Sequence, residues 1–158
     1  MTSPGSNKDK TLTAGNRITQ LSVFLENRSG RIASIASALG EAGVNIRAMA
    51  LADSSDFGIL RLIVNDTEKA LAALKDRGFI IKLNDVVAVQ VPDEAGALGR
   101  TLAAIEDQSL NIEYLYAFIE KPGESAVLIF RFEDVDHAIA LLKAANIRML
   151  DGAALENR

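Results

Sequence analysis

Hydrophobic and polar positions along the chain follow one pattern that occurs twice. In the first half, apolar residues recur at i, i+3, i+4 and i+7, the spacing of one helical face, as Ile32, Ile35, Ala36 and Leu39. Gly43 then supplies the residue that can end a helix in the left-handed conformation. A second helical pattern spans 67–76, and β-rich extended runs lie at 20–25, 46–52, 59–64 and 79–83. These patterns predict the order strand, helix, strand, strand, helix, strand.

The second half repeats this order. A shift of 66 positions aligns Gly30 with Gly96 and Asn45 with Asn111, and a shift of 68 aligns Asp66 with Asp134. The difference of two residues falls in a hairpin loop. Helical faces are predicted at Leu98, Leu102 and Ile105 and over 134–144, and extended runs at 86–91, 111–119, 125–132 and 147–150. The chain is therefore a doubled unit.

The repeated order predicts an α+β fold with two tandem βαββαβ modules of the ferredoxin-like type. Right-handed crossovers place both helices of each module on one face of an antiparallel sheet. The modules are expected at 18–83 and 85–150, combined side by side because almost no linker separates them. Residues 1–17 are expected to be a disordered leader and 151–158 a C-terminal tail.

The composition of the chain disfavours several classes of binding partner. The formal charge of −4 and the isoelectric point near 5.0 disfavour nucleic acid and anionic membranes, which need clustered cations. The absence of cysteine excludes disulfides and thiolate zinc sites and fits a cytoplasmic location. No apolar run approaches the roughly 18 residues that span a bilayer.

Two sequence stretches carry a family resemblance. Residues 20–31 read QLSVFLENRSGR, and Gly43-Val44-Asn45-Ile46 follows the first predicted helix. This pattern resembles the ACT domain, a small-molecule-binding module of amino-acid metabolism, and the resemblance covers both halves. With residues 56–61, DFGILR, the whole is similar to stand-alone tandem ACT proteins, which have no catalytic domain.

The resemblance implies where a ligand binds. Family members bind an amino acid at the loop between the first strand and the first helix, commonly at an interface with a neighbouring module. These proteins transmit the occupancy of the binding site to an enzyme. The corresponding positions are Asn27, Arg28, Ser29, Gly30, Arg31 and Asn45 in the first half and Asp93, Ala95, Gly96 and Asn111 in the second.

The loop chemistry suits a zwitterionic ligand. A helix N-terminus offers unpaired N–H groups and partial positive charge to a carboxylate. Gly30 can adopt a positive φ, and Asn27 and Asn45 each offer a donor and an acceptor. The alternative is that the loop is a turn with Ser29 as a helix cap and that Asn45 only follows the helix.

The two loops differ in charge. The second half has Asp93 and Glu94 where the first has Asn27 and Arg28. Like charges weaken carboxylate binding, so the first loop is predicted to be the stronger anion site. Asp93 is expected either to cap its helix or to accept a ligand ammonium.

Alternating residues on the second strand of each half suggest an interface. Ala48 and Ala50, with Ala52, share one face, and the equivalent face of the second half carries Tyr114, Tyr116 and Phe118. These faces are predicted to form a contact between modules or protomers, with tyrosine hydroxyls able to reach a ligand. Ordinary core packing is the alternative.

The sequence gives little support for catalysis or for RNA binding. His137, the only histidine, has no evident acid–base partner, and no catalytic or metal motif is present. Phe130 and Phe132 share a strand but lack the basic surface that RNA binding needs. The resemblance to ACT proteins instead implies an amino-acid sensor that regulates a metabolic enzyme, or a regulatory subunit attached to a biosynthetic enzyme. We expect it to be a homodimer without a cofactor.

Overall fold

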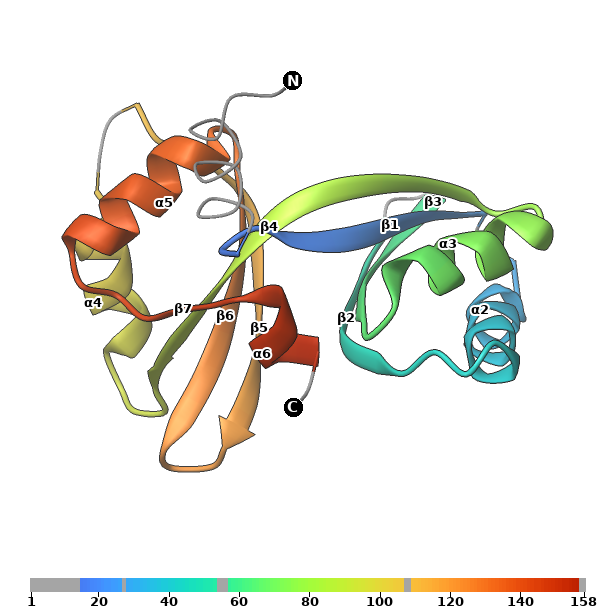
Figure 1. Ribbon diagram of the computed structural model, residues 1–158, viewed down its shortest axis with the longest axis horizontal. Coiled ribbons are helices and arrows are strands. Elements are labelled where there is room, and N and C mark those ends of the chain that lie inside the picture. The colour runs from blue at the N-terminus through green and yellow to red at the C-terminus, as the bar shows by residue number, and fades with distance from the viewer. Residues whose placement is uncertain (1–14, 27, 54–56, 107–108, 157–158) are drawn as a thin grey trace, which may run out of the picture. The chain divides into compact units, whose positions relative to one another are not determined.

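The chain forms two units in the computed structural model, which describes residues 15–26, 28–53, 57–106 and 109–156. Residues 19–84 make up most of one unit, and residues 85–154 make up most of the other. Figure 1 shows that each unit has its two longer helices on one face of its sheet. Among the described residues, the helices are too short or too polar to cross a membrane.

The first unit follows the predicted order of elements. Its sheet has the order β2-β3-β1-β4, in which β3 runs antiparallel to both β1 and β2. The helices α2 and α3 contact each other on one face (Figure 1). The bounds are β1 Ile18–Glu26, α2 Arg31–Glu41, β2 Ile46–Asp53, β3 Phe57–Val64, α3 Thr67–Asp76 and β4 Ile80–Pro92.

The second unit repeats the plan with the order β5-β6-β4-β7, all antiparallel. Its elements are α4 Ala97–Ala104, β5 Ile112–Lys121, β6 Ser125–Phe132, α5 Val135–Ala144, β7 Met149–Leu150 and α6 Gly152–Glu156. The α+β fold of two βαββαβ repeats is confirmed. Three details differ: β7 is shorter than the predicted run at 147–150, α6 lies where a tail was expected, and β4 continues through Asn84 and Asp85.

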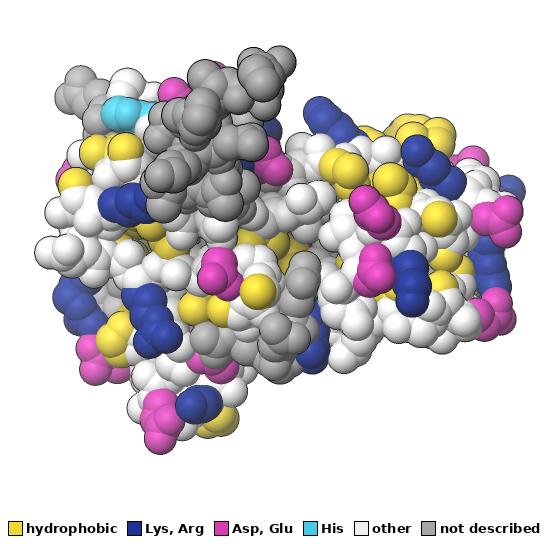
Figure 2. Space-filling model, in the orientation of Figure 1, with side chains coloured by type: hydrophobic (Ala, Val, Ile, Leu, Met, Phe, Trp, Pro, Cys, Tyr) yellow, Lys and Arg dark blue, Asp and Glu magenta, His cyan; other side chains and the backbone are white. Residues whose placement is uncertain are grey.

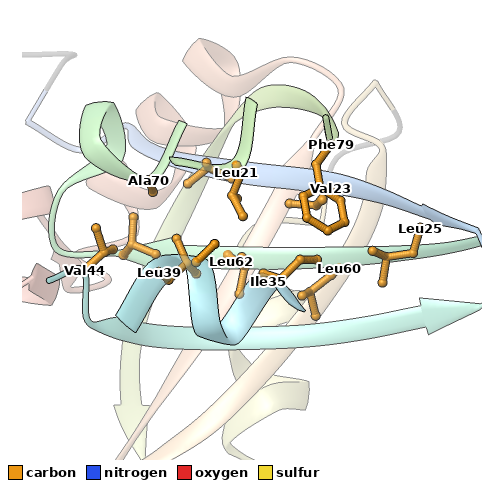
Figure 3. Close-up of a cluster of buried hydrophobic side chains, with 13 residues drawn as sticks. Leu21, Val23, Leu25, Ile35, Leu39, Val44, Leu60, Leu62, Ala70 and Phe79 are labelled. Carbon is orange, nitrogen blue, oxygen red and sulfur yellow. The ribbon is translucent and has the colours of Figure 1, made fainter. Parts of the chain in front are cut away.

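Each unit has its own hydrophobic core between sheet and helices. Figure 3 shows Ile35 and Leu39 of α2 meeting Leu21, Val23, Leu25, Leu60 and Leu62 of the central strands. The buried face of α2 is rotated from the predicted one, because Ala38 is buried whereas Ile32 and Ala36 are exposed. Alanine is small enough to let the helix approach the sheet closely.

The second core is built in the same way around two aromatic rings. Phe130 and Phe132 are fully buried and stack with ring centroids 5.2 Å apart. They pack among core residues and are inaccessible to stacking bases. Of the predicted face of α4, Ile105 is buried and Leu102 packs against the core, whereas Leu98 is exposed and Ala97 and Thr101 are buried in its place.

The second helix of each unit begins with an aspartate cap. The Asp66 carboxylate accepts a hydrogen bond from the Lys69 N–H, and the Asp134 carboxylate accepts one from the His137 N–H, each at 3.1 Å. The first helices differ. Gly30, not Ser29, occupies the N-cap position of α2, and among the described residues no side chain caps that helix.

These caps predict a contrast in stability. Asp66→Ala should lower the free energy of unfolding by about 1 kcal/mol, because a helix N–H loses its acceptor. Ser29→Ala should change it by no more than about 0.5 kcal/mol, because the exposed Ser29 caps nothing. Urea denaturation of the ligand-free protein measures both. Equal losses in the two variants would restore Ser29 as a cap.

Candidate functional site

The loop between β1 and α2 turns through a left-handed glycine. Gly30 has φ of 85°, and its carbonyl accepts a hydrogen bond from the Ser34 N–H at 2.9 Å. Upstream, the Arg28 N–H donates to the Glu26 carbonyl at 2.7 Å. Asn27 lies outside the described residues. The first turn of α2 contains no acidic residue, so its N–H groups and partial positive charge are not offset there.

Two guanidinium groups flank this helix start. Arg28 is exposed and pairs with Glu26, whose Oε2 lies 3.4 Å from the Arg28 Nε. The Arg31 guanidinium lies 4.7 Å from the centre of the Phe79 ring. Its buried Nε has no hydrogen-bond partner among the described residues. The loop therefore offers more cationic donors than its one carboxylate satisfies.

The equivalent loop of the second unit has the same backbone and different chemistry. Gly96 has φ of 88° and occupies the N-cap of α4, again without a side-chain cap. The Arg100 Nη2 lies 2.5 Å from the Glu94 Oε1, so this cation is paired within the loop. Ala95, the counterpart of Ser29, is exposed and has no polar group in its side chain.

Asp93 does not cap α4, in contrast to one of its two expected roles. Its Oδ2 accepts a hydrogen bond of 2.8 Å from the Gly123 N–H, which belongs to the hairpin between β5 and β6. The Asp93 N–H in turn donates to the Glu124 carbonyl at 3.2 Å. Asp93 therefore joins two loops of its own unit. Sequence spacing gave no sign of this contact, because thirty positions separate the partners.

The two elements that carry the resemblance, the β1–α2 loop and Asn45, are not brought together within the first module. Gly30 precedes α2 and Asn45 follows it, and a helix of eleven residues spans about 16 Å. The strand register agrees: Glu26 pairs with Phe57 at the loop end of the sheet, whereas Ile46 pairs with Val64 at the Asn45 end. A small ligand at the loop cannot reach the Asn45 of the same module.

Asn45 and Asn111 have backbone roles at that far end. The Asn45 N–H donates to the Asn65 Oδ1 at 2.9 Å, and the Asn65 N–H donates to the Asn45 carbonyl at 3.1 Å. In the second unit the Glu133 N–H donates to the Asn111 carbonyl at 3.0 Å. The side chains of both asparagines are exposed. These contacts hold the start of β2 and β5 beside the end of the neighbouring strand.

The alanine and tyrosine rows lie on the sheet faces away from the helices. Ala48 and Ala50 stand opposite Ile63 and Arg61, and these alternate along β3 with residues of the helix-side core. Tyr114 and Tyr116 likewise stand opposite Arg131 and Ile129. Packing of these rows against α2 and α3 in the first unit, or against α4 and α5 in the second, is therefore ruled out.

A charged cluster that the sequence did not suggest lies in the second unit. Arg17 pairs with Asp85 at 2.7 Å and with Asp136 at 2.5 Å. The hydrogen bond with Asp136 is the main reason that the pKa of Arg17 is raised, and Asp85 adds to it. These groups line a hollow of about 420 Å³ with Arg131, Glu133, Asp134 and Val135. Its carboxylates outnumber its cations, which makes it a poor site for an anion.

Neither a metal site nor a basic surface is evident in the described part of the chain. No group of three or more metal-binding side chains comes together there. On the face shown in Figure 2, Lys and Arg side chains are interspersed with Asp and Glu side chains over the residues that the structure describes. This distribution does not suit a phosphate backbone.

Comparisons with known proteins agree with this architecture. A family model described as an ACT domain pair matches residues 16–157. The crystal structure of protein BT0572 from Bacteroides thetaiotaomicron is 36% identical, covers 90% of this chain and 98% of its own, and gives a TM-score of 0.84. The ligand-free regulatory subunit of aspartate kinase from Thermus thermophilus is 18% identical, with 83% and 91% of the two chains covered and a TM-score of 0.61. No curated protein matched the sequence.

The left-handed glycine predicts opposite effects of two alanine substitutions. Gly30→Ala should destabilise the protein by about 1 kcal/mol, because a Cβ strains the backbone at φ of 85° even though no atom lies within 4 Å of it. Gly40→Ala, inside α2 and equally unobstructed, should stabilise it by roughly 0.5–1 kcal/mol. Denaturant titration measures both. A gain in stability for Gly30→Ala would show that the loop tolerates an ordinary backbone conformation.

Proposed function

This chain belongs to the ACT domain family as a pair of ACT domains, and from that membership we propose that it is an amino-acid sensor. ACT domains are regulatory domains that bind small molecules such as amino acids. In the proposal, binding of a free amino acid changes the association of the protein or its control of a metabolic enzyme. The protein itself is non-catalytic and acts in the cytoplasm. Coupling requires that the ligand bind one state better than another.

The observation that carries the proposal is the chemistry of the β1–α2 loop. Its helix start has neither a side-chain cap nor a first-turn acid, and Arg28 and Arg31 flank it. The Arg28–Glu26 pair is exposed, so it is worth at most about 1 kcal/mol. A ligand carboxylate can therefore replace Glu26 at low cost and also accept hydrogen bonds from the helix N–H groups.

The loop between β4 and α4 supports a difference in ligand affinity between the two modules. Its cation, Arg100, is already paired with Glu94, and Asp93 is held by the hairpin backbone. A ligand carboxylate would meet two carboxylates there. We therefore assign the stronger amino-acid site to the first module.

The separation of the β1–α2 loop from Asn45 within one module constrains how the protein assembles around a ligand. Because α2 separates Gly30 from Asn45, a ligand that touches both a loop and such an asparagine must take the two from different modules. A homodimer, in which a second copy of the chain supplies the missing group, meets this requirement. The alanine and tyrosine rows, which face away from their own helices, are offered as surfaces that such a contact uses or that line the ligand.

A stably attached regulatory subunit is the second candidate. The regulatory subunit of aspartate kinase from Thermus thermophilus shares this fold, and the match covers 91% of that chain. A separate chain of this kind would remain bound to a catalytic chain through purification. Isolation from the native source under mild conditions distinguishes the two candidates, because a free sensor would emerge without an enzyme.

A thermal-shift series with the free amino acids tests the proposed site. A ligand present at a concentration of about 100 times its Kd should raise the free energy of unfolding by roughly 2.7 kcal/mol. Arg28→Ala should weaken that ligand by about ten- to a hundredfold, since it removes a charge-assisted hydrogen bond. Glu94→Ala, at the equivalent position of the second loop, is the matched control and should leave the affinity nearly unchanged.

Two results would contradict the proposal. If no amino acid raises the unfolding temperature, the sensor role fails. If Glu94→Ala weakens binding more than Arg28→Ala does, the assignment to the first module is wrong and the ligand belongs to the second loop.

A further inference from the structure

Three large apolar side chains are exposed at the loop end of the sheet in the first module. Phe24 is 39% exposed, Phe57 is 59% exposed and Ile80 is 70% exposed. Each alternates along its strand with residues of the helix-side core, so all three lie on the face of the sheet away from α2 and α3. We call these three side chains the apolar platform.

Two side chains of the apolar platform lie beside the proposed carboxylate site. Glu26 stands directly opposite Phe57 at the last position of the β1–β3 ladder, and Phe24 lies two positions before Glu26 on the same face. Opposed side chains in an antiparallel pair have Cβ atoms about 4.5–5.5 Å apart. The Arg28 Nε in turn lies 3.4 Å from the Glu26 Oε2. A ligand whose carboxylate replaces Glu26 on Arg28 therefore has its side chain within reach of Phe57.

Ile80 extends the apolar platform on the other side of β1. It lies on β4, which neighbours β1 in the sheet. The ring of Phe79, the preceding residue, lies 4.7 Å from the guanidinium of the first residue of α2, so this end of β4 is at the loop. In the second module the counterparts of Phe24 and Ile80 are joined directly, since the Gln90 N–H donates to the Arg148 carbonyl at 2.9 Å. The repeated fold therefore makes Phe24 and Ile80 neighbours on adjacent strands.

The second module has polar groups at the same three places. The counterparts of Phe24, Phe57 and Ile80 are Gln90, Ser125 and Arg148. The Gln90 Nε2 and the Ser125 Oγ both donate to the Glu120 Oε1, at 2.7 Å and 2.9 Å. An apolar side chain placed there would desolvate a carboxylate and its donors, which is unfavourable. The two modules therefore differ in side-chain chemistry as well as in the charge of their loops.

The size and the border of the apolar platform favour a small occupant. Exposed charged side chains adjoin it, namely Glu26 and Arg28 at the loop and Lys82 two positions after Ile80 on the same face. Protein–protein interfaces are much larger and are depleted of charge at their centre. The apolar platform instead suits the single side chain of a ligand whose carboxylate contacts Arg28.

We propose that the apolar platform is the side-chain subsite of the first-module amino-acid site, and that its ligands are α-amino acids with a large apolar side chain, such as leucine or phenylalanine. Arg28 binds the carboxylate, and Phe24, Phe57 and Ile80 contact the side chain. This inference rests on the proposed function, because it requires an amino acid at the first loop. It adds the class of side chain, which membership of the family leaves open.

Isothermal titration of the full chain with leucine, phenylalanine, alanine and serine tests the class of ligand. Leucine and phenylalanine should bind at least about tenfold more tightly than alanine, because their side chains bury apolar surface in addition to the shared carboxylate contact. Serine should bind no more tightly than alanine, because its hydroxyl gains nothing from an apolar surface.

Substitution by the residues of the second module tests the subsite. Phe57→Ser should lower the ratio of leucine affinity to alanine affinity about threefold, and Phe24→Gln with Phe57→Ser should bring the two affinities nearly together. The ratio isolates the side-chain subsite, because Arg28→Ala weakens both ligands alike. Met49→Gln is the matched control, since Met49 is exposed but stands opposite Leu62 on the helix-side face, and it should leave the ratio unchanged.

The outcomes separate this inference from the sensor role. If none of the free amino acids binds, the sensor role fails and the subsite fails with it. If amino acids bind through Arg28 but serine or alanine matches leucine, the sensor role stands and the apolar class is wrong. An unchanged ratio in the double variant would also overturn the subsite, and a loss of self-association in that variant would then assign the apolar platform to a contact between copies of the chain.

Discussion

The positive φ of Gly30 and Gly96 is the constraint on which both candidate sites depend. At these values a Cβ strains the backbone, so glycine is required where each first strand turns into its helix. Because glycine occupies the N-cap position of each helix, that position has no side chain that could cap the helix. Neither helix start receives a cap from the side chain of its N-cap residue, and the neighbouring side chains decide what its N–H groups attract.

Those neighbouring side chains have diverged between the halves. The first loop surrounds its helix start with Arg28 and Arg31, whereas the second pairs its arginine with Glu94 and fixes Asp93 to a hairpin. The shared backbone thus carries two different electrostatic environments.

Local features of the fold were predictable from the sequence. The doubled order of elements follows from apolar periodicity, and the Asp66 and Asp134 caps follow from an aspartate placed just before a helical pattern. The predicted faces of α2 and α4 were right at the later positions, such as Leu39 and Ile105, and wrong at the first turn, where Ile32 and Leu98 are exposed. Ala38 and Ala97 are buried although the pattern did not mark them. Periodicity identifies a helix, but tertiary packing selects which small residues approach the sheet.

Contacts between distant residues were not predictable. The loop residues and Asn45 were both expected to contact the ligand, yet the helix between them carries them to opposite ends of the module. Arg17 was expected in a disordered leader, but it pairs with Asp85 and Asp136, which lie 68 and 119 positions away. No local pattern encodes such partners, because they meet only once the sheet is formed.

Strand β5 contains six consecutive apolar residues, Tyr114 to Ile119, which also matter before the fold is complete. A segment of this length with high β-propensity, no net charge and no proline is the type that forms aggregates when it is exposed. During synthesis, Tyr114 to Ile119 emerge before β6 and so lack, for a time, the strand with which β5 pairs in the structure. Glu113, Glu120 and Lys121 flank the segment and act as gatekeepers against misassembly in this interval. The yield of soluble protein from the cell should therefore depend more on these three charges than their small contribution to folded-state stability would suggest.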